Sequence, residues 1–120
     1  MQPQLQEGDY VFCTVPSLAG FDTVQLAGMF REEEGFTIVI KKELADSLQL
    51  PYSFVAGWIT LTVHSSLEAV GLTAAFATAL ARQNISCNVV AAFYHDHIFV
   101  NKKDAAKAIT VLQQLAASGV

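Results

Sequence analysis

The sequence is poor in charged residues. Only 15% of its 120 residues are Asp, Glu, Lys or Arg, whereas about a quarter is usual for soluble proteins. The formal net charge is -4, and the basic residues cluster only as the pairs Lys41-Lys42 and Lys102-Lys103, so nucleic acid is not an expected partner. A chain with so few charges has to hide more of its surface from water, which predicts a homodimer or a higher homo-oligomer.

Long apolar runs and a leader segment are also missing. No apolar run approaches the roughly 20 residues that a membrane-spanning helix needs, and residues 1–4 do not begin a basic and then apolar signal segment. We therefore expect a cytoplasmic protein with no membrane partner. The sequence has only two cysteines, Cys13 and Cys87, each within an apolar run, which predicts small buried side chains and no disulfide.

The second half of the sequence has the clearer pattern of secondary structure. Ser65 and Glu68 have the spacing of a capping box and predict the start of an apolar helix that continues to Ala81. The run from Ser86 to Tyr94 is nearly all apolar, which is typical of a strand covered on both faces. The order from residue 56 onward is therefore strand, helix, strand, strand, helix, with predicted elements at 58–63, 66–81, 86–94, 97–100 and 102–116.

The first half repeats this order with its first helix reduced. A strand at 9–15 leads into a segment broken by Gly and Pro, then a hairpin closed by Gly35, then a helix at 43–50 that Pro51 ends. We therefore predict an α+β protein made of two tandem ferredoxin-like βαββα halves, residues 1–55 and 56–120. Each half is expected to have an antiparallel sheet with its helices packed on one face.

Two stretches carry a resemblance to a known family. Residues 61–72, which include Val70-Gly71-Leu72, and residues 81–88, which include Asn84-Ile85-Ser86, resemble the first helix and its exit in an ACT domain. Residues 62–100 look like small uncharacterised proteins with two tandem ACT-like domains. The resemblance implies a non-catalytic regulatory protein, without a cofactor, that binds an amino acid at the turn between a strand and a helix, often across an interface.

The candidate ligand site is the start of the helix that follows the strand at 58–63. Free N–H groups and the positive end of the helix dipole suit a ligand carboxylate, and Glu68 or Asp96 suits its ammonium group. A plain capping box without a ligand is the simpler interpretation of Ser65 and Glu68. The residues predicted to line the site are His64, Ser65, Ser66, Glu68, Val70, Gly71, Leu72, Cys87 and Asn88.

Two alternatives to ligand binding remain open. The first is a structural association module, in which the apolar helix at 69–81 packs against a partner. The second is a metal-dependent enzyme that uses His95, His97 and the more distant His64, although a turn with half-exposed rings is the simpler interpretation. A nucleophile pair of Cys87 and His95 is disfavoured because an apolar strand raises the pKa of a thiol. We therefore predict no catalytic residues and no bound metal.

Overall fold

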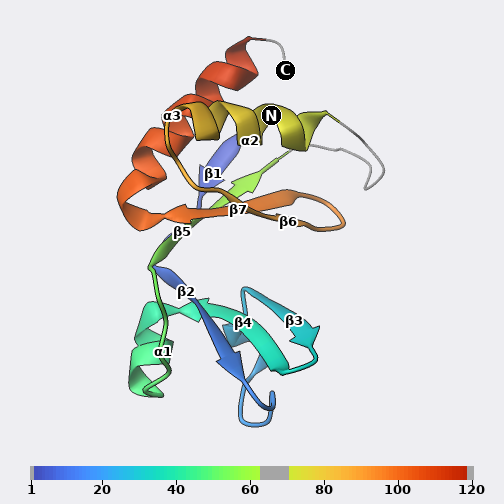
Figure 1. The fold of residues 1–120 in the computed structure, drawn as a ribbon, viewed down its shortest axis with the longest axis vertical. Coiled ribbons are helices and arrows are strands. Elements are labelled where there is room, and N and C mark those ends of the chain that lie inside the picture. Colours follow the sequence, from blue (N-terminus) through green and yellow to red (C-terminus); the bar gives the residue numbers. More distant parts are fainter. Residues whose placement is uncertain (1, 63–70, 119–120) are drawn as a thin grey trace. The chain divides into compact units, whose positions relative to one another are not determined.

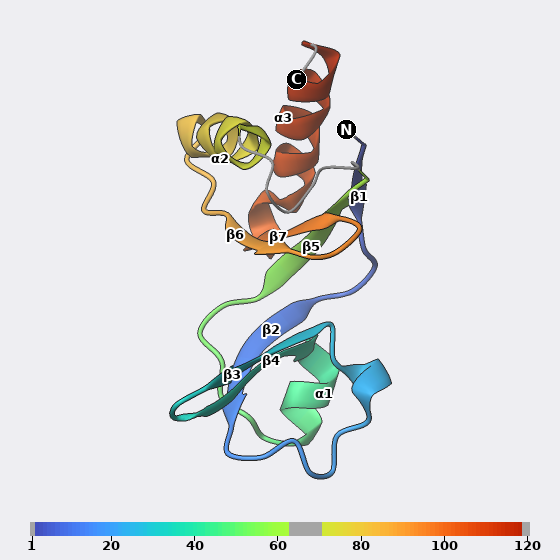
Figure 2. The same cartoon turned by 90° about the vertical axis from the view of Figure 1, so that its right-hand side faces the viewer.

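The chain forms two compact units in the computed structural model, which describes residues 2–62 and 71–118. One unit consists of Gly8–Ala56, and the other combines Met1–Glu7 with Gly57–Val120. Both have antiparallel strands and packed helices (Figures 1 and 2), which confirms the predicted α+β class. The two units differ from the predicted halves in one respect, which is that residues 1–7 belong to the second unit.

The unit Gly8–Ala56 contains a sheet in the order β3-β4-β2. Its strands β2 (Tyr10–Val15), β3 (Gly28–Glu32) and β4 (Gly35–Lys41) confirm the predicted strand and hairpin. The hairpin pairs Glu32 with Gly35, and Gly35 has a φ of 146°. A Cβ at Gly35 would lie 2.6 Å from the carbonyl oxygen of Val15, so glycine is required there.

A short helix covers one face of this sheet. Helix α1 (Lys42–Ser47) packs its buried Ala45 against a core that includes Val11, Ile38 and Ile40. The helix ends earlier than the predicted residue 50, because Gln49 adopts a left-handed φ of 57°. The predicted break after β2 is confirmed, since that connector contains only the short 3-10 helix η1 (Thr23–Gln25).

The other unit has strands in the order β1-β5-β7-β6. These are β1 (Pro3–Leu5), β5 (Ala56–Leu61), β6 (Asn88–Ala91) and β7 (Asp96–Asn101). Pro3, Gln4 and Leu5 pair with Leu61, Thr60 and Ile59, so the beginning of the chain supplies an outer strand to this sheet. That pairing is the reason why residues 1–7 belong to this unit.

Two helices lie on the same face of this sheet (Figure 2). Helix α2 (Leu72–Arg82) contributes the fully buried Phe76 and Leu80, and α3 (Ala105–Ala117) contributes Ala108 and Leu112. They pack on Ile59, Leu61, Ile98 and Val100 from the two central strands. The predicted cap Asn101 accepts a hydrogen bond from the N–H of Lys103 at 3.2 Å and begins the 3-10 helix η2 (Lys102–Asp104), which leads into α3.

Strand β6 does not have the environment that its apolar sequence predicted. The expectation was a strand covered on both faces over residues 86–94, but β6 spans Asn88–Ala91 and all of its residues are exposed. The reason is topological, since β6 is the last strand in the order and pairs with β7 along one edge. Among the described residues, no helix is both long and apolar enough to cross a membrane.

Candidate functional site

Most of the predicted ligand-binding residues lie outside the described residues. These are His64, Ser65, Ser66, Glu68 and Val70. The structure describes the remaining four, Gly71, Leu72, Cys87 and Asn88. Gly71 and Leu72 stand at the start of α2, and Cys87 and Asn88 follow its end in the sequence.

Gly71 immediately precedes α2. Its φ of 101° lies in the left-handed region, and its carbonyl oxygen accepts the first helical hydrogen bond from the N–H of Ala75 at 2.9 Å. Among residues 2–62 and 71–118, no side-chain hydrogen bond caps this end of α2, and a Cβ at Gly71 would meet no atom within 4 Å. The first N–H groups of a helix have no intrahelical partner and carry partial positive charge. This end of α2 therefore presents N–H donors that suit an anionic group.

Cys87 and Asn88 lie beyond the other end of the helix. Helix α2 has 11 residues, which corresponds to a length of about 16 Å, and Ile85 hydrogen-bonds back to Leu80 near its C-terminus. Asn88 begins β6, and its side-chain amide donates to the carbonyl oxygen of Phe99 at 3.4 Å. Cys87 and Asn88 therefore follow the C-terminal end of α2 in the sequence, whereas Gly71 and Leu72 stand at its start.

Leu72 and Cys87 both pack against the core of their unit. Burial raises the pKa of the Cys87 thiol to about 11. The thiol is therefore protonated at neutral pH and lacks the thiolate form that a nucleophile or a metal ligand needs. Both cysteines are free of disulfide bonds.

Asp96, which the sequence indicates as a partner for a ligand ammonium group, lies at the end of the sheet where β5 finishes. Trp58 contacts Phe99 and Thr60 contacts His97, so β5 and β7 run in opposite directions, and Asp96 lies at the end where β5 finishes. Figure 1 shows the first turn of α2 and the β6–β7 turn toward the same end of this sheet. Asp96 is 8% exposed, and alternation along β7 places it on the face that carries the helices.

A hydrogen-bonded group on the opposite face of the sheet was not anticipated. The indole Nε1 of Trp58 donates to Nδ1 of His97 at 3.0 Å, and the hydroxyl of Thr60 lies 3.1 Å from the same nitrogen. Gln6 donates in turn to Thr60 at 3.0 Å. Because an indole N–H only donates, Nδ1 of His97 is an acceptor and the ring is neutral. Burial lowers the pKa of His97, and the neighbouring His95 lowers it further.

His95 and His97 are the two histidines of the metal hypothesis that the structure describes. Their ring centroids are 6.3 Å apart with an interplanar angle of 86°, and Nδ1 of His95 is buried and has no hydrogen-bond partner within the part of the chain that the structure describes. Within residues 2–62 and 71–118, no group of three His, Cys, Asp or Glu side chains is arranged to hold a metal. His64, the proposed third ligand, lies outside those residues.

Comparison with solved structures identifies close and distant relatives. A protein of unknown function from Vibrio cholerae, described as a possible transport protein, is 54% identical, with a TM-score of 0.86 over 92% of this chain and 86% of that chain. The regulatory subunit of aspartate kinase from Thermus thermophilus is 8% identical, with a TM-score of 0.64 over 96% and 97%. Aspartokinase alpha and beta subunits are 12% identical, with a TM-score of 0.65 over 98% of each chain.

The similarity to the two aspartate kinase structures, at 8% and 12% identity, shows a shared fold. A comparison with curated proteins found no match. Two models of the ACT domain match in tandem, one over residues 1–57 and the other over residues 53–114. The chain therefore belongs to the ACT domain family.

Proposed function

We propose that this protein is a non-catalytic regulatory module that binds an amino acid at the start of α2. ACT domains are typically regulatory and bind amino acids, and one of the structural neighbours is itself a regulatory subunit. The observation that carries the proposal is the start of α2 at Gly71, where no described side chain caps the helix and no described atom would meet a Cβ. Its unpaired N–H groups suit the ligand carboxylate, and the buried Asp96 at this end of the sheet suits the ammonium group.

The predicted lining residues remain part of this proposal with one change. His64, Ser65, Ser66, Glu68 and Val70 precede Gly71 in the sequence, and we retain them with Gly71 and Leu72 as the proposed lining. Cys87 and Asn88 follow the C-terminal end of α2, so we do not include them in the site of the same chain.

A thermal-shift screen of the twenty amino acids tests this function. A ligand present at about 100 times its Kd stabilises the folded state by roughly 2.7 kcal/mol, which gives a clear rise in Tm. Gly71→Ala adds a side chain at the start of α2 and should reduce the ligand-induced rise. Gly20→Ala is the matched control, because Gly20 also has a positive φ of 88° and open surroundings. The absence of a shift with all twenty amino acids would rule out the proposal.

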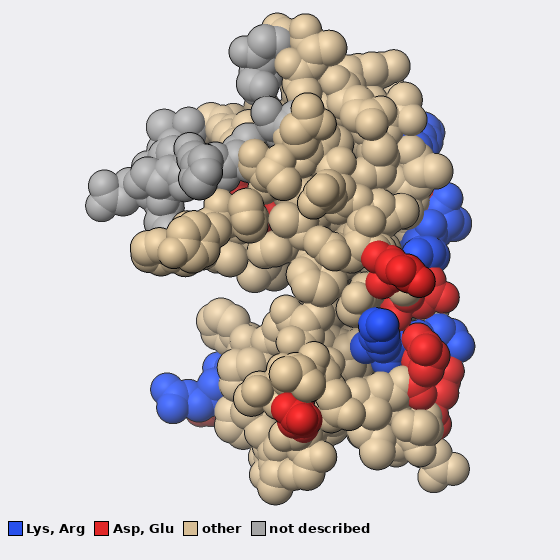
Figure 3. Space-filling model, turned by 180° about the vertical axis from the view of Figure 1, so that it is seen from behind, with Lys and Arg blue, Asp and Glu red and all other residues tan. Residues whose placement is uncertain are grey.

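The exposed edge of β6 favours a second function, homo-oligomerisation. No Asp, Glu, Lys or Arg occurs from residue 83 to residue 95, although edge strands are usually protected by charge. Val90 is 47% exposed, and Phe93 and Tyr94 in the adjacent turn are 77% and 66% exposed. In Figure 3 the Lys and Arg side chains of this unit lie along one margin, a small red area shows beside the grey residues, and most of the unit's other visible surface is tan. We propose that a second copy pairs along this edge.

Sedimentation velocity separates the two functions. Val90→Lys places a charge on β6 and should convert the oligomer to a monomer. Val24→Lys is the control, since Val24 is 86% exposed in the other unit. Ala75→Glu on α2 tests the alternative helix surface, and if it alone dissociates the assembly, the contact is helical. A wild-type protein that is monomeric at high concentration would contradict the association proposal and leave amino-acid binding to its own screen.

A further inference from the structure

Strand β2 has one edge that is fully paired and one that is not. All of its residues, from Tyr10 to Val15, have partners on β4. On the other edge, the ladder within the described residues contains the single pair Tyr10 and Ala56. Residues 51–53 run beside β2 without extending this ladder. Pro51 has no N–H to donate, and the chain bends at Ser53. A gap remains beside the second half of β2.

Contacts with α1 and with β2 position the segment that borders the gap. Tyr52 donates from its hydroxyl to Oδ1 of Asp46 at 2.7 Å, and Lys42 donates to Oδ2 of the same carboxylate at 2.8 Å. Phe54 stacks on Phe12, with ring centroids 6.0 Å apart and an interplanar angle of 19°. Segment 51–54 is thereby attached at Tyr52 to α1 and at Phe54 to β2.

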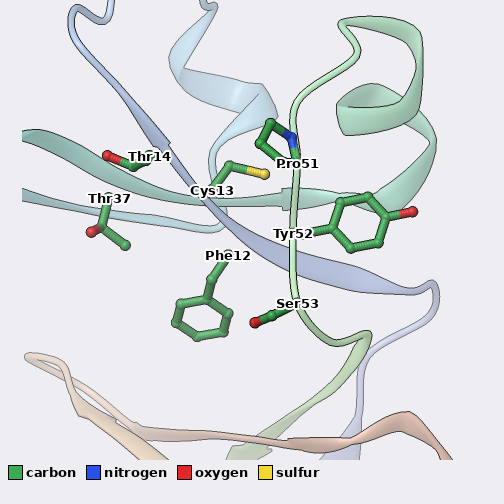
Figure 4. A pocket seen from close by; sticks show the side chains of 7 residues that line it. All are labelled: Phe12, Cys13, Thr14, Thr37, Pro51, Tyr52 and Ser53. Carbon is green, nitrogen blue, oxygen red and sulfur yellow. The ribbon is translucent and has the colours of Figure 1, made fainter.

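The gap forms a hollow of about 400 Å³, which falls within the usual range of small-molecule sites. Figure 4 shows Thr14 and Thr37 beside one another and Ser53 across from β2. Thr14 and Thr37 are direct partners in the β2–β4 register, which explains their proximity. The lining residues are Phe12, Cys13, Thr14, Thr37, Pro51, Tyr52 and Ser53.

The chemistry of this lining is polar but uncharged. It contains three aliphatic hydroxyls, two aromatic rings and a proline, and no Lys, Arg, Asp or Glu. Burial raises the pKa of the Cys13 thiol, which is therefore neutral. Thr37 donates its hydroxyl proton to Glu32 and presents lone pairs to the hollow. A zwitterion placed here would lose the hydration of its charges without gaining a charged partner among these residues. An uncharged ring has no charges to desolvate, and its polar edges can bond to the hydroxyls.

We propose that this hollow binds an uncharged, planar heterocycle of nucleobase size. The ring packs within the hollow beside Phe12 and Pro51, and its edge exchanges hydrogen bonds with the hydroxyls of Thr14 and Ser53. All lining residues belong to the unit Gly8–Ala56. The site is therefore separate from the one proposed at α2 and differs from it in ligand charge.

Methyl NMR of threonine-labelled full-length protein tests the proposal with adenine as the probe. Millimolar adenine should shift the methyl resonances of Thr14 and Thr37 in a saturable manner. Thr14→Val retains shape but removes a hydroxyl, and Ser53→Ala removes another. The loss of one hydrogen bond should raise the Kd roughly two- to tenfold for each variant. Thr110→Val in α3, which is exposed in the other unit, should leave the Kd unchanged.

Three results would overturn this inference. The first is the absence of a saturable shift of either methyl at millimolar adenine. The second is an unchanged Kd in both Thr14→Val and Ser53→Ala, since the variants report independently if one fails to fold. The third is a stronger response of the same methyls to an amino acid than to adenine. None of these results bears on the screen of amino acids at α2, so the two proposals fail separately.

Discussion

Replacing Trp58 with phenylalanine tests the hydrogen bond that holds His97 neutral. The indole donates to Nδ1 of His97 at 3.0 Å, and a protonated ring carries a proton on that nitrogen and cannot accept. Trp58→Phe keeps a ring to stack on Phe99, whose centroid lies 5.9 Å from that of Trp58, but it lacks the donor. We expect the pKa of His97 to rise toward its ordinary value, while burial keeps it below that value.

The same substitution should change how stability depends on pH. The hydrogen bond contributes about 0.5–1.5 kcal/mol, which Trp58→Phe loses at pH 8 together with some packing. The folded-state pKa of His97 lies below its value in the unfolded chain, which is near 6.5. The stability that depends on a neutral His97 is therefore complete above about pH 6.5. It falls as the pH drops toward the folded-state pKa, since the unfolded chain binds the proton first. The fall should be smaller in Trp58→Phe.

NMR titration of the histidine rings and urea unfolding at pH 8 and pH 5.5 supply the measurements. His97→Gln is the control, because its amide oxygen can accept from Trp58 but does not titrate, and it should remove the contribution of His97 to the pH dependence. The reasoning is refuted if His97 in the wild-type protein titrates at or above pH 6.5. It is also refuted if Trp58→Phe leaves its pKa unchanged.

Three further predictions concern glycine, core packing and thiol chemistry. Gly35→Ala should lower the free energy of unfolding by roughly 1–3 kcal/mol, because a Cβ there meets the backbone of Val15 at 2.6 Å. A loss no larger than that of Gly20→Ala in urea titrations would contradict this. Leu80→Ala, at a fully buried position, should lower the free energy of unfolding by about 2–5 kcal/mol in the same assay. A loss below about 1 kcal/mol would show that neighbouring side chains repack into the cavity. The alkylation rate of Cys87 should still be rising at pH 10, since its pKa is about 11. A plateau near pH 8 in mass spectrometry would refute that value.

Local signals in the sequence predicted those elements whose causes are local. The hairpin was predictable because Gly35 can adopt the positive φ that its closing turn needs, and the final helix because its apolar residues recur with helical spacing. The end of α1 was predicted too late. Pro51 marks where a helix cannot continue, whereas the left-handed Gln49 ends it sooner, and glutamine gives no warning of that conformation.

Features set by topology were not predictable from local pattern. An apolar run such as residues 88–91 usually indicates a central strand, but its place at the edge depends on the strand order of the whole sheet. Strand β1 has three residues without a periodic signal. At the candidate site, the sequence indicated Asp96 and the start of the helix. It gave no sign that His97 and Trp58 would meet, because 39 residues separate them.

The pairing of β1 with β5 determines when the larger unit can be completed. The side chain of Gln6 bonds to a residue 54 positions later, and the backbone of Gln2 to one 60 positions later. During synthesis, residues 2–6 must therefore wait for residues 58–62, while the unit Gly8–Ala56 lies between them in sequence and has its own core. Closing so long a loop slows folding more than it lowers stability. Deletion of residues 2–6 would remove the outer strand β1 from the unit that contains α2 and α3, and it would leave the unit Gly8–Ala56 whole.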